Sequence, residues 1–595
     1  MPELDGITLH REQVAALNDL LAGRNLILSA PTSFGKSLLI DALLASGKYA
    51  RVAIVLPTIA LLDEFRRRIK RRFVEQFDLI IHPGEKPKDG RATIFLGTQE
   101  RLINRTDIGK LDLTVVDEFY KLDPNRKDER SITLNVAVSK LLNRSNQFFF
   151  LGPNIDDVRF SGDGRWKFEF LRTRFSTVAV DTYDLGGVAD KEAQLFEEIA
   201  KECHWPALVF VSAPGKANRL AIRAAEQKAI SDGSADFAQW LSDNVGLGCP
   251  LVQTVRFGFG VHHGRLPRAI ASQMVRMFNQ KDLPILFCTS TLIEGVNTAA
   301  KTVLIFDKKI NRADYDFFTY SNIKGRAGRL GEHHVGQVYL FDEAPEQEST
   351  EVAPTLFGDQ DDAPDDYVVH LEDQEITRRT DTRIGKLKME LGLDADGLRL
   401  AASVGLENSL SLKQAVTGAL SENANLVWAG VPKYQEIRAV VDVICSVRRA
   451  VEFGAFNPSQ LTFFIHNLRK ASSMREFLLT YDSKYKSDPE AYDNIFKFLR
   501  ACEYGLPQHL AVVEMFVKQE APAADFSLFN ESISRWFKPE VLKNLDEEGI
   551  PIQISERFYE GEDKEQLTKK LLLLACGRSQ DLTAFEQKWI LAAIE

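Results

Sequence analysis

A lysine, a serine and a later pair of acids have the residue types and spacing needed for phosphate chemistry. The stretch 30–37 reads Ala-Pro-Thr-Ser-Phe-Gly-Lys-Ser, between two apolar runs. A strand–loop–helix of this kind points backbone N–H groups at a phosphate, and the helix N-terminus adds positive potential. Lys36 is then expected to reach the β- and γ-phosphates, and the Ser37 hydroxyl to hold Mg²⁺. The residues expected to bind nucleotide are Pro31, Thr32, Ser33, Phe34, Gly35, Lys36 and Ser37. Ala30 departs from the usual first glycine, and an ordinary turn is the alternative.

Two adjacent acids, Asp117 and Glu118, end a short β-branched run that begins at Leu113. A buried parallel strand delivers side chains to its carboxyl edge in this way. We expect Asp117 to hold Mg²⁺ through water, and Glu118 to orient and polarise the attacking water. The alternative is a solvated acidic pair at the end of a strand.

A pair of arginines follows much later, in the sequence Gly-Arg-Ala-Gly-Arg at 325–329. Arg326 and Arg329 are three residues apart, so both face one side of a helix. An arginine from a second domain contacts the γ-phosphate only when two domains close, which couples nucleotide state to domain motion. The alternative is a basic surface helix that uses small residues for packing.

Two series of apolar, β-branched runs must position these residues. They alternate with helical patterns, which is typical of parallel sheets covered by helices on both faces. We therefore expect two α/β domains in tandem, with ATP bound between them. The expected strands are Leu26–Ser29, Val52–Leu56, Ala92–Leu96, Thr114–Val116 and Gln147–Leu151, then Ala207–Val211, Val252–Val255, Ile285–Cys288, Val303–Phe306 and Gln337–Phe341.

Beyond residue 342 the composition changes twice. The segment from Glu343 to about Glu375 is acidic and rich in Pro, Gln and Asp, which predicts a flexible linker or exposed loop. Apolar spacing near the helical period follows, and no chemical motif accompanies it. The expected helices are Ile376–Leu391, Leu412–Leu420, Lys433–Phe453, Pro458–Leu468, Tyr492–Tyr504, His509–Lys518, Thr568–Ala575 and Leu582–Ile594.

Bulk composition narrows the class of protein. The six cysteines include no C-x-x-C pair, which argues against a structural zinc site and a disulfide framework and indicates a reducing, cytoplasmic compartment. No leader peptide or run of about twenty apolar residues is visible, so we expect no membrane partner. The net charge of −10 does not indicate a broadly basic nucleic-acid-binding surface, although a cleft can be locally basic.

The order of these motifs resembles that of superfamily 2 helicases, and within them the Ski-like DExH-box group. The resemblance covers about residues 9 to 342. The matching segments are Gln13 upstream of the phosphate loop, 30–37 as motif I, 57–58 as Ia, 97–101 as Ib, 117–120 as II, 151–154 as III, 210–211 as the start of IV, 260–266 as a His-His segment, 289–297 as V and 325–329 as VI. Motif II ends in Phe119-Tyr120 instead of a polar pair, motif III lacks Ser-Ala-Thr, and Asn322 stands where motif VI usually begins with Gln. The coupling of hydrolysis to movement is therefore expected to differ.

The resemblance implies a fold and a set of ligands. Two RecA-like parallel-sheet domains are expected at 1–185, which binds ATP, and at 186–345, with an acidic linker or loop at 346–375. A winged-helix-like or helical segment at 376–435 and a helical bundle at 436–595 would complete a mainly α-helical C-terminal region. Gln13 would read adenine, and Gly295 and Asn297 would also lie at the nucleotide, which is ATP with Mg²⁺.

The activity implied is ATP-driven movement, usually 3′ to 5′, on single-stranded DNA or RNA or on a duplex with a single-stranded tail. Hydroxyls and backbone N–H groups of the two domains would grip the sugar–phosphate backbone without reading sequence. The candidate contacts are Pro57, Thr58, Thr98, Arg101, Thr289 and Thr291. Threonines at strand ends are also common helix caps. The choice between DNA and RNA depends on 2′-OH contacts that no motif encodes.

Two further features have more than one interpretation. The basic run 66–72 could guide phosphates, but the solvated face of a helix is favoured, with Phe65, Ile69 and Phe73 packed inward. His262 and His263 could suggest a metal, but further ligands at a fitting spacing are missing, which favours a structural role.

A second function from another class remains open. Segments 291–297 and 117–120 resemble the corresponding motifs in helicases of bacterial defence operons, including the Hachiman antiphage system. The chain would then be a nucleic-acid-sensing ATPase subunit that gates a partner effector such as a nuclease. A small-molecule P-loop enzyme fits motif I alone and leaves motif VI unexplained.

Overall fold

The computed structural model describes residues 8–82, 84–103, 105–126, 130–153, 155–160, 166–175, 178–227, 233–293, 298, 300–310, 313–328, 335–422, 425–485 and 488–594. Its internal contacts divide the chain into two compact units. The first consists of 1–212, 288–367 and 372–377, and the second of 213–287, 368–371 and 378–595. Each unit is described by itself. Gly295, Asn297 and Arg329, three of the expected site residues, lie outside the described residues.

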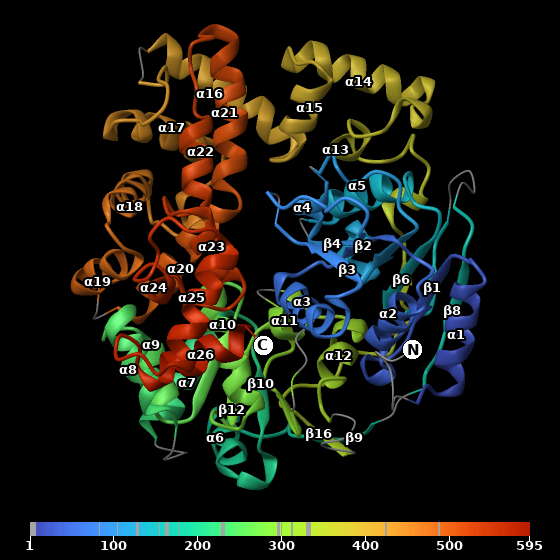
Figure 1. Cartoon of the computed structure of the whole chain (residues 1–595), viewed down its shortest axis with the longest axis vertical. Coiled ribbons are helices and arrows are strands. Elements are labelled where there is room, and N and C mark those ends of the chain that lie inside the picture. The colour runs from blue at the N-terminus through green and yellow to red at the C-terminus, as the bar shows by residue number, and fades with distance from the viewer. Residues whose placement is uncertain are drawn as a thin grey trace. The chain divides into compact units, whose positions relative to one another are not determined.

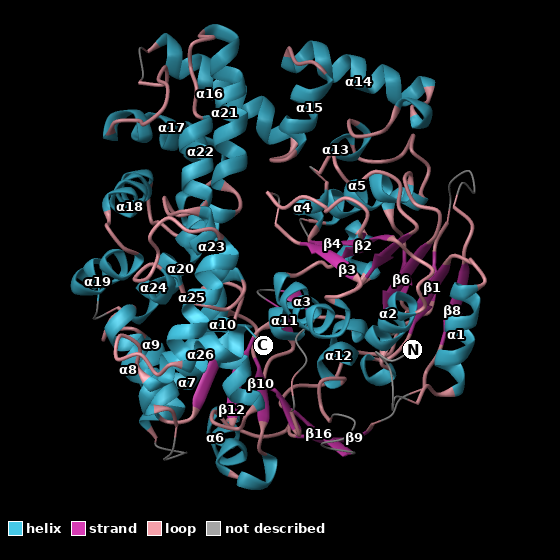
Figure 2. Ribbon diagram, in the orientation of Figure 1, coloured by secondary structure: helices cyan, strands magenta, loops and turns pink. Residues whose placement is uncertain are grey.

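The first unit contains a sheet of seven parallel strands in the order β3-β4-β2-β5-β6-β1-β8 (Figure 2). Its inner strands are near-continuous apolar runs because helices cover both faces. The strand bounds are β1 Leu26–Ser29, β2 Arg51–Val55, β3 Phe77–Ile80, β4 Ala92–Gly97, β5 Leu113–Val116, β6 Phe148–Gly152 and β8 Glu169–Arg172. The helices around it are α1 Arg11–Leu21, α2 Lys36–Ala45, α3 Ile59–Phe73, α4 Gln99–Leu102 and α5 Ser131–Leu142 (Figure 1).

The second sheet has the order β11-β12-β10-β13-β16-β9. Its strands are β9 Ala179–Asp184, β10 Ala207–Phe210, β11 Phe259–His262, β12 Ile285–Cys288, β13 Thr302–Ile305 and β16 Val335–Leu340. The pairs β10–β13, β13–β16 and β16–β9 are parallel. The expected α/β class with two tandem RecA-like sheets is thus confirmed.

One expected strand is wrong, and four strands of the two sheets, β3, β8, β9 and β11, were not expected. Residues Val252–Val255 lie in helix α9, Pro250–Arg256, and strand β11 follows it. Four apolar or β-branched residues fit either element, while a proline in the first helical turn favours the helix. The other three unexpected strands are β3, β8 and β9. All three are edge strands, whose partly solvated faces weaken the apolar pattern.

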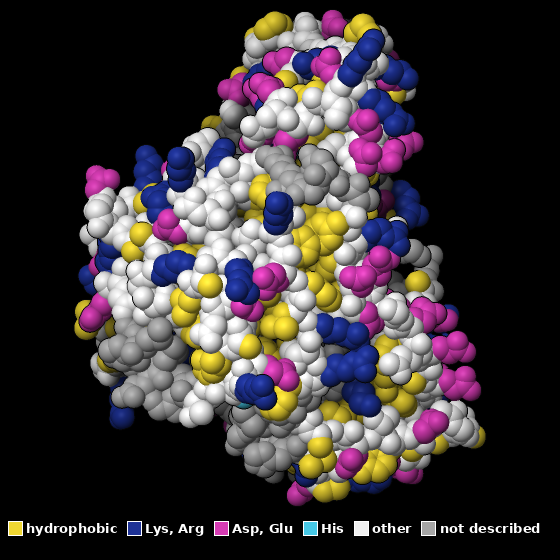
Figure 3. Space-filling model, turned by 90° about the vertical axis from the view of Figure 1, so that its right-hand side faces the viewer, with side chains coloured by type: hydrophobic (Ala, Val, Ile, Leu, Met, Phe, Trp, Pro, Cys, Tyr) yellow, Lys and Arg dark blue, Asp and Glu magenta, His cyan; other side chains and the backbone are white. Residues whose placement is uncertain are grey.

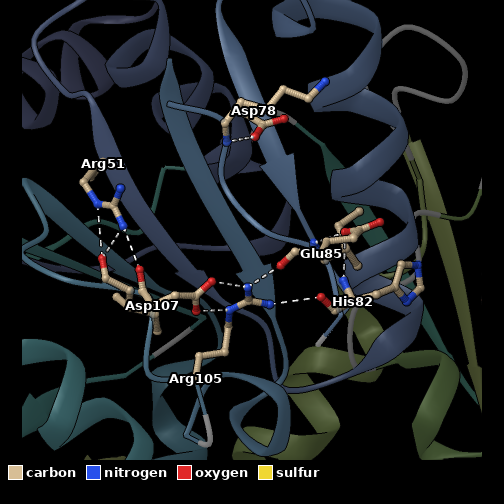
Figure 4. A network of polar contacts seen from close by, with 9 residues as sticks. Arg51, Asp78, His82, Glu85, Arg105 and Asp107 are labelled. Atoms are coloured by element: carbon tan, nitrogen blue, oxygen red, sulfur yellow. Dashed lines mark hydrogen bonds and ion pairs between the residues drawn. The ribbon is translucent and has the colours of Figure 1, made fainter. Parts of the chain in front are cut away.

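Two arginines fix the loop after β3 and the loop before β5 (Figure 4). Arg105 donates to the backbone carbonyls of His82, at 3.0 Å, and Glu85, at 2.6 Å. Arg51 donates to the carbonyl of Asp107 at 2.9 Å, and the Arg105 guanidinium beside Asp107 holds the pKa of that carboxyl below its ordinary value. Both arginines lie over the buried ring of Phe95. Their donors are directed at protein carbonyls, so they serve the fold.

The acidic segment after residue 342 is not the exposed, flexible linker that its composition predicts. Within it β17, Glu351–Val352, pairs in parallel with β7, Asp157–Val158. The backbone N–H of Ala353 donates to the Asp123 carboxylate at 3.1 Å, and that of Leu356 to the Asn135 side chain at 2.9 Å.

A few apolar residues explain this packing. Val352, Leu356 and Phe357 are buried, and the Phe357 ring lies 4.6 Å from Phe160 and 6.0 Å from Phe150. Several of the acids remain exposed on the outer side. Burial of three large side chains outweighs the entropy of ordering a short segment, which composition alone does not reveal.

The C-terminal region is helical, as expected. Its helices are α14 Arg378–Leu391, α15 Ala395–Ala402, α16 Leu406–Ser421, α17 Tyr434–Val447, α18 Pro458–Lys470, α19 Met474–Tyr485, α20 Pro489–Glu503, α21 Leu506–Glu520, α22 Ser527–Ser534, α23 Glu540–Glu547, α24 Ile552–Ser555, α25 Lys564–Cys576 and α26 Ala584–Ile594. The winged-helix identity of 376–435 and the other domain boundaries stay predictions. Among the described residues, every helix is too short or too polar to cross a bilayer.

Candidate active site

The phosphate loop joins β1 to α2 at the carboxyl edge of the first sheet. Thr32–Phe34 forms a 3-10 turn, Gly35 has φ 79° and ψ 36°, and α2 begins at Lys36. Lys36 Nζ donates to the carbonyls of Ala30, at 2.9 Å, and Pro31, at 3.3 Å. Burial lowers the pKa of Lys36, which Glu118 and Asp117 oppose and Arg326 reinforces. The ammonium is therefore held by backbone carbonyls and feels the charge of both carboxylates, and phosphate oxygens could replace the carbonyls as its partners.

Gln13 lies directly against this loop. It is buried in the first turn of α1, where it forms a capping box with His10, and its Nε2 donates to the Phe34 carbonyl at 2.8 Å. A Cβ at position 35 would lie 2.8 Å from that same nitrogen, and the left-handed backbone of this residue favours glycine. The upstream glutamine and the loop thus form one structural element.

The two acids of motif II end β5 and are both almost fully buried. The Asp117 backbone N–H donates to the Val55 carbonyl at 3.1 Å, and the Asp117 carboxylate accepts the N–H of Glu118 at 2.9 Å. Glu118 has φ 52°, an uncommon conformation for a non-glycine residue that is often found at functional sites.

Electrostatics set the two acids apart from ordinary carboxylates. Burial raises the pKa of Asp117, and it raises the pKa of Glu118 to about 7, with the Asp117 charge adding to the effect. Lys36 and Arg326 act in the opposite direction on both groups. A carboxyl with a pKa near neutrality is suited to take a proton from water.

Motif VI begins on α12, Phe317–Lys324, in the same unit. A Cβ at Gly325 would lie 2.9 Å from Thr32 Oγ1, so this turn lies on the phosphate loop. The Arg326 charge acts on the pKa of Lys36, Asp117 and Glu118. The structure therefore brings the arginine, the lysine and both acids together.

The donor set fits a magnesium ion. The Ser37 hydroxyl and the Asp117 carboxylate are hard oxygen ligands of the type that Mg²⁺ combines with water and substrate phosphates. Among the described residues, no group of three or more His, Cys, Asp or Glu is arranged to hold a metal.

Four of the residues expected to contact nucleic acid lie at the carboxyl ends of two neighbouring strands in the first sheet. Strands β2 and β4 are neighbours, with Val55 opposite Gly97, so the residues that follow them emerge side by side. These residues are Pro57, Thr58, Thr98 and Arg101.

Their side chains differ in what they contact. Thr58 caps α3 by accepting the N–H of Leu61 at 3.4 Å. Thr98 is fully buried, and within the described part of the chain its hydroxyl has no hydrogen-bond partner. Directly after β12 of the second sheet, where α11, Ser290–Ile293, begins, the hydroxyls of Thr289 and Thr291 lie 3.2 Å apart.

Sequence reasoning missed Arg130, which contacts both the turn after β2 and the turn after β4. It donates to the Pro57 carbonyl at 2.9 Å and pairs with Glu100 at 2.7 Å. It stands outside every recognised motif, and nothing in the local pattern marks it. Its role follows from the tertiary fold alone.

The basic run on α3 is only in part the solvated face that its charge pattern favours: Lys70 and Arg71 are exposed, but other arginines of the run are not. Phe65, Ile69 and Phe73 pack inward as expected, but Arg66 is buried and pairs with Asp63 at 2.6 Å. Arg68 and Arg72 pair with Asp41, which is 1% exposed. These arginines compensate buried acids, since an unpaired buried carboxylate would be costly.

The His-His segment is buried as well. Burial lowers the pKa of His262 to about 4 and that of His263 to about 3, so both rings are neutral near pH 7. His263 Nε2 lies 3.5 Å from the buried carboxylate of Asp493 on α20, in the same unit.

On the face of the molecule drawn in Figure 3, Lys and Arg side chains are interspersed with acids and apolar surface. No single basic stripe dominates the described part of this face, in keeping with the net charge of −10.

Comparison with known proteins identifies the family of this chain. The DEAD/DEAH box helicase model matches residues 10–151, and the helicase conserved C-terminal domain model matches residues 240–331. Anti-bacteriophage protein B of Escherichia coli (strain K12) is 31% identical over 94% of this chain and 81% of its own length. Helicase POLQ-like of Homo sapiens is 24% identical over 55% of this chain and 34% of that protein, and DNA polymerase theta of Caenorhabditis elegans is 24% identical over 55% and 23%. The chain therefore belongs to the superfamily 2 helicases, in the family of Anti-bacteriophage protein B.

Proposed function

We propose that this helicase-type ATPase moves 3′ to 5′ along single-stranded nucleic acid and acts in antiphage defence. One observation carries the proposal most directly: Lys36, the Asp117–Glu118 pair and Arg326 share one electrostatic environment at the phosphate loop. The name of the relative Anti-bacteriophage protein B supports the defence role.

Each residue then has a defined task in hydrolysis. Lys36 binds the β- and γ-phosphates, and Ser37 and Asp117 hold Mg²⁺, which would supply charge neutralisation at the phosphate oxygens. Glu118 orients the attacking water and accepts its proton. Arg326 stabilises the charge that develops on the transferred phosphoryl group.

Movement follows from gripping the strand at two places. Pro57, Thr58, Thr98 and Arg101 would contact the backbone from the first sheet, and Thr289 and Thr291 from the second. Closure on ATP and reopening after hydrolysis would shift one grip relative to the other.

The test is an ATPase assay with four additions: single-stranded DNA, single-stranded RNA, and each duplex with a 3′ overhang. We expect strong stimulation by a single strand, and its loss in Lys36→Ala and Arg326→Ala. Lys110→Ala, an exposed lysine in the loop before β5, is the matched control and should behave like the wild type. Equal turnover with and without nucleic acid would reject the proposal.

A second candidate function is an ATPase subunit that gates a partner effector such as a nuclease. The aromatic end of motif II favours it, since the usual link between hydrolysis and movement is altered. Purification from the native host would then yield a stoichiometric partner, and a strand-separation assay would show little processive unwinding. A chain that unwinds duplexes efficiently without a partner argues against it.

A further inference from the structure

Motif II ends in two aromatic residues, Phe119 and Tyr120, and each contacts a different motif. Phe119 is fully buried, and a Cβ at Gly152 of motif III would lie 2.9 Å from its ring. Tyr120 points to the helix of motif VI, and its ring lies 4.6 Å from that of Phe318 in an edge-to-face arrangement. The positions that are polar in related helicases thus make close aromatic contacts with motifs III and VI.

Arg126 completes the contact on the motif VI side. Its guanidinium lies 4.1 Å from the centre of the Phe318 ring and 5.7 Å from that of Tyr120. It also pairs with Asp316 at 3.2 Å, from a side chain that is only 17% exposed. A cation between two aromatic rings and a carboxylate is held in one geometry.

Asp316 also fixes the start of the helix. It is the N-cap of α12, and its Oδ1 accepts the N–H of Thr319 at 2.8 Å while Oδ2 faces Arg126. Both the cap and the aromatic contact therefore hold the first turn of α12.

The other end of α12 reaches the nucleotide-binding loop. The helix ends at Lys324, Gly325 lies against Thr32, and Arg326 follows directly. A helix is a rigid element, so fixing its first turn against motif II also fixes the position of Arg326. The distance from cap to arginine is under three helical turns.

We propose that Tyr120, Arg126, Asp316 and Phe318 form a junction that positions Arg326 for hydrolysis, in place of polar contacts between motifs II and VI. The proposal rests on the proposed ATP hydrolysis. The four are positioning residues, because they act through α12 and Arg326. Loosening the junction should slow turnover and leave nucleotide binding to the phosphate loop intact.

The experiment is a double-mutant cycle with Tyr120→Leu, Phe318→Leu and the double variant in the full chain. We expect each single variant to lower kcat about tenfold, with KM for ATP and the affinity for a fluorescent ADP analogue within about twofold of wild type. The double variant should be close to either single variant, because both remove one contact.

Conservative variants and a control separate positioning from folding. Tyr120→Phe keeps the ring and should retain most activity, and Asp316→Asn keeps the cap but should lower kcat by losing the ion pair with Arg126. Tyr183→Leu removes an aromatic contact with Tyr339 in the second sheet and should leave kcat unchanged. Melting curves identify any variant that fails to fold.

Several outcomes overturn the junction: wild-type kcat in Tyr120→Leu, independent losses that multiply in the double variant, or a rise in KM without a fall in kcat. If the wild type hydrolyses ATP and these variants have wild-type kcat, the junction is rejected and the proposed function stands. A wild-type chain without ATPase activity rejects the proposed function and the junction together.

Discussion

Charges are buried in both units, but they are balanced differently. At the phosphate loop, burial lowers the pKa of Lys36 and raises those of Asp117 and Glu118, so every member is pushed towards its neutral form. In the second unit Glu503 is equally buried, and burial alone would raise its pKa. Lys543, Arg500 and Arg268 outweigh that effect and bring its pKa to about 2.

In the second cluster, cations of the protein itself outweigh burial at Glu503, whereas burial still raises the pKa of the neighbouring Asp546 to about 6. Lys543 pairs with Glu503, lies 3.7 Å from Asp546 and lies 3.3 Å from the centre of the Trp536 ring. Arg268 reaches Glu503 from α10, Arg268–Asn279, at 3.5 Å. An acid pair whose pKa values are both raised is a candidate site for charged ligands, whereas a carboxylate whose pKa is lowered by neighbouring cations is typical of a structural ion cluster.

The largest expected effect is the loss of activity in Lys36→Ala. ATPase turnover should fall by about a thousandfold or more, because a transition-state contact is removed. Since the wild-type ammonium is desolvated and incompletely paired, the free energy of unfolding should change by less than about 1 kcal/mol. Steady-state kinetics and urea unfolding check both parts. A large loss of stability would contradict the contrast between the clusters.

Lys543→Met should give the reverse pattern. Removal of one partner from a compensated buried cluster destabilises by about 3 kcal/mol. Four of the six tryptophans lie in the second unit, so their fluorescence during urea unfolding reports this loss. The kcat of the folded fraction should match the wild type, and Lys569→Met, at an exposed lysine on α25, is the control. Unchanged stability would show that the cluster contributes little.

Lowering the pH should reduce the stability that Glu503 contributes to the second cluster. Its folded pKa of about 2 lies below the ordinary 4.5, so its contribution is full above about pH 4.5 and is lost as pH falls towards 2. Between about pH 5 and pH 3 the wild type should lose about 2 kcal/mol more unfolding free energy than Glu503→Gln. Asp546, whose pKa burial raises to about 6, has the opposite trend in the wild type. Parallel curves of stability against pH would contradict this assignment.

The smallest effect is expected at an exposed charge outside both clusters. Arg71 lies on the exposed side of α3, next to arginines that pair with acids. Arg71→Gln should change the affinity for single-stranded nucleic acid by less than about twofold. Fluorescence anisotropy at several salt concentrations measures this. A decrease of about one in the slope of log Kd against log salt would show a phosphate contact at this position.

The arginines show where sequence patterns fail. Arg66 and Arg71 are equivalent in a charge pattern, yet one is buried against Asp63 and the other is exposed. Arg126 and Arg130 belong to no motif, but they hold Asp316 and Pro57. Burial in the folded chain decides these roles, whether the partner is as near in sequence as Asp63 or as far as Asp316.

The sequence by itself determined the class of fold and marked the candidate catalytic groups, because buried parallel strands, phosphate loops and helical periodicity are local patterns. Only the tertiary structure decided which charges are compensated, that the acidic segment after β16 packs through Phe357, and that Tyr120 meets Phe318. These outcomes depend on burial and on distances between segments that are separate in sequence, and both are properties of the folded chain.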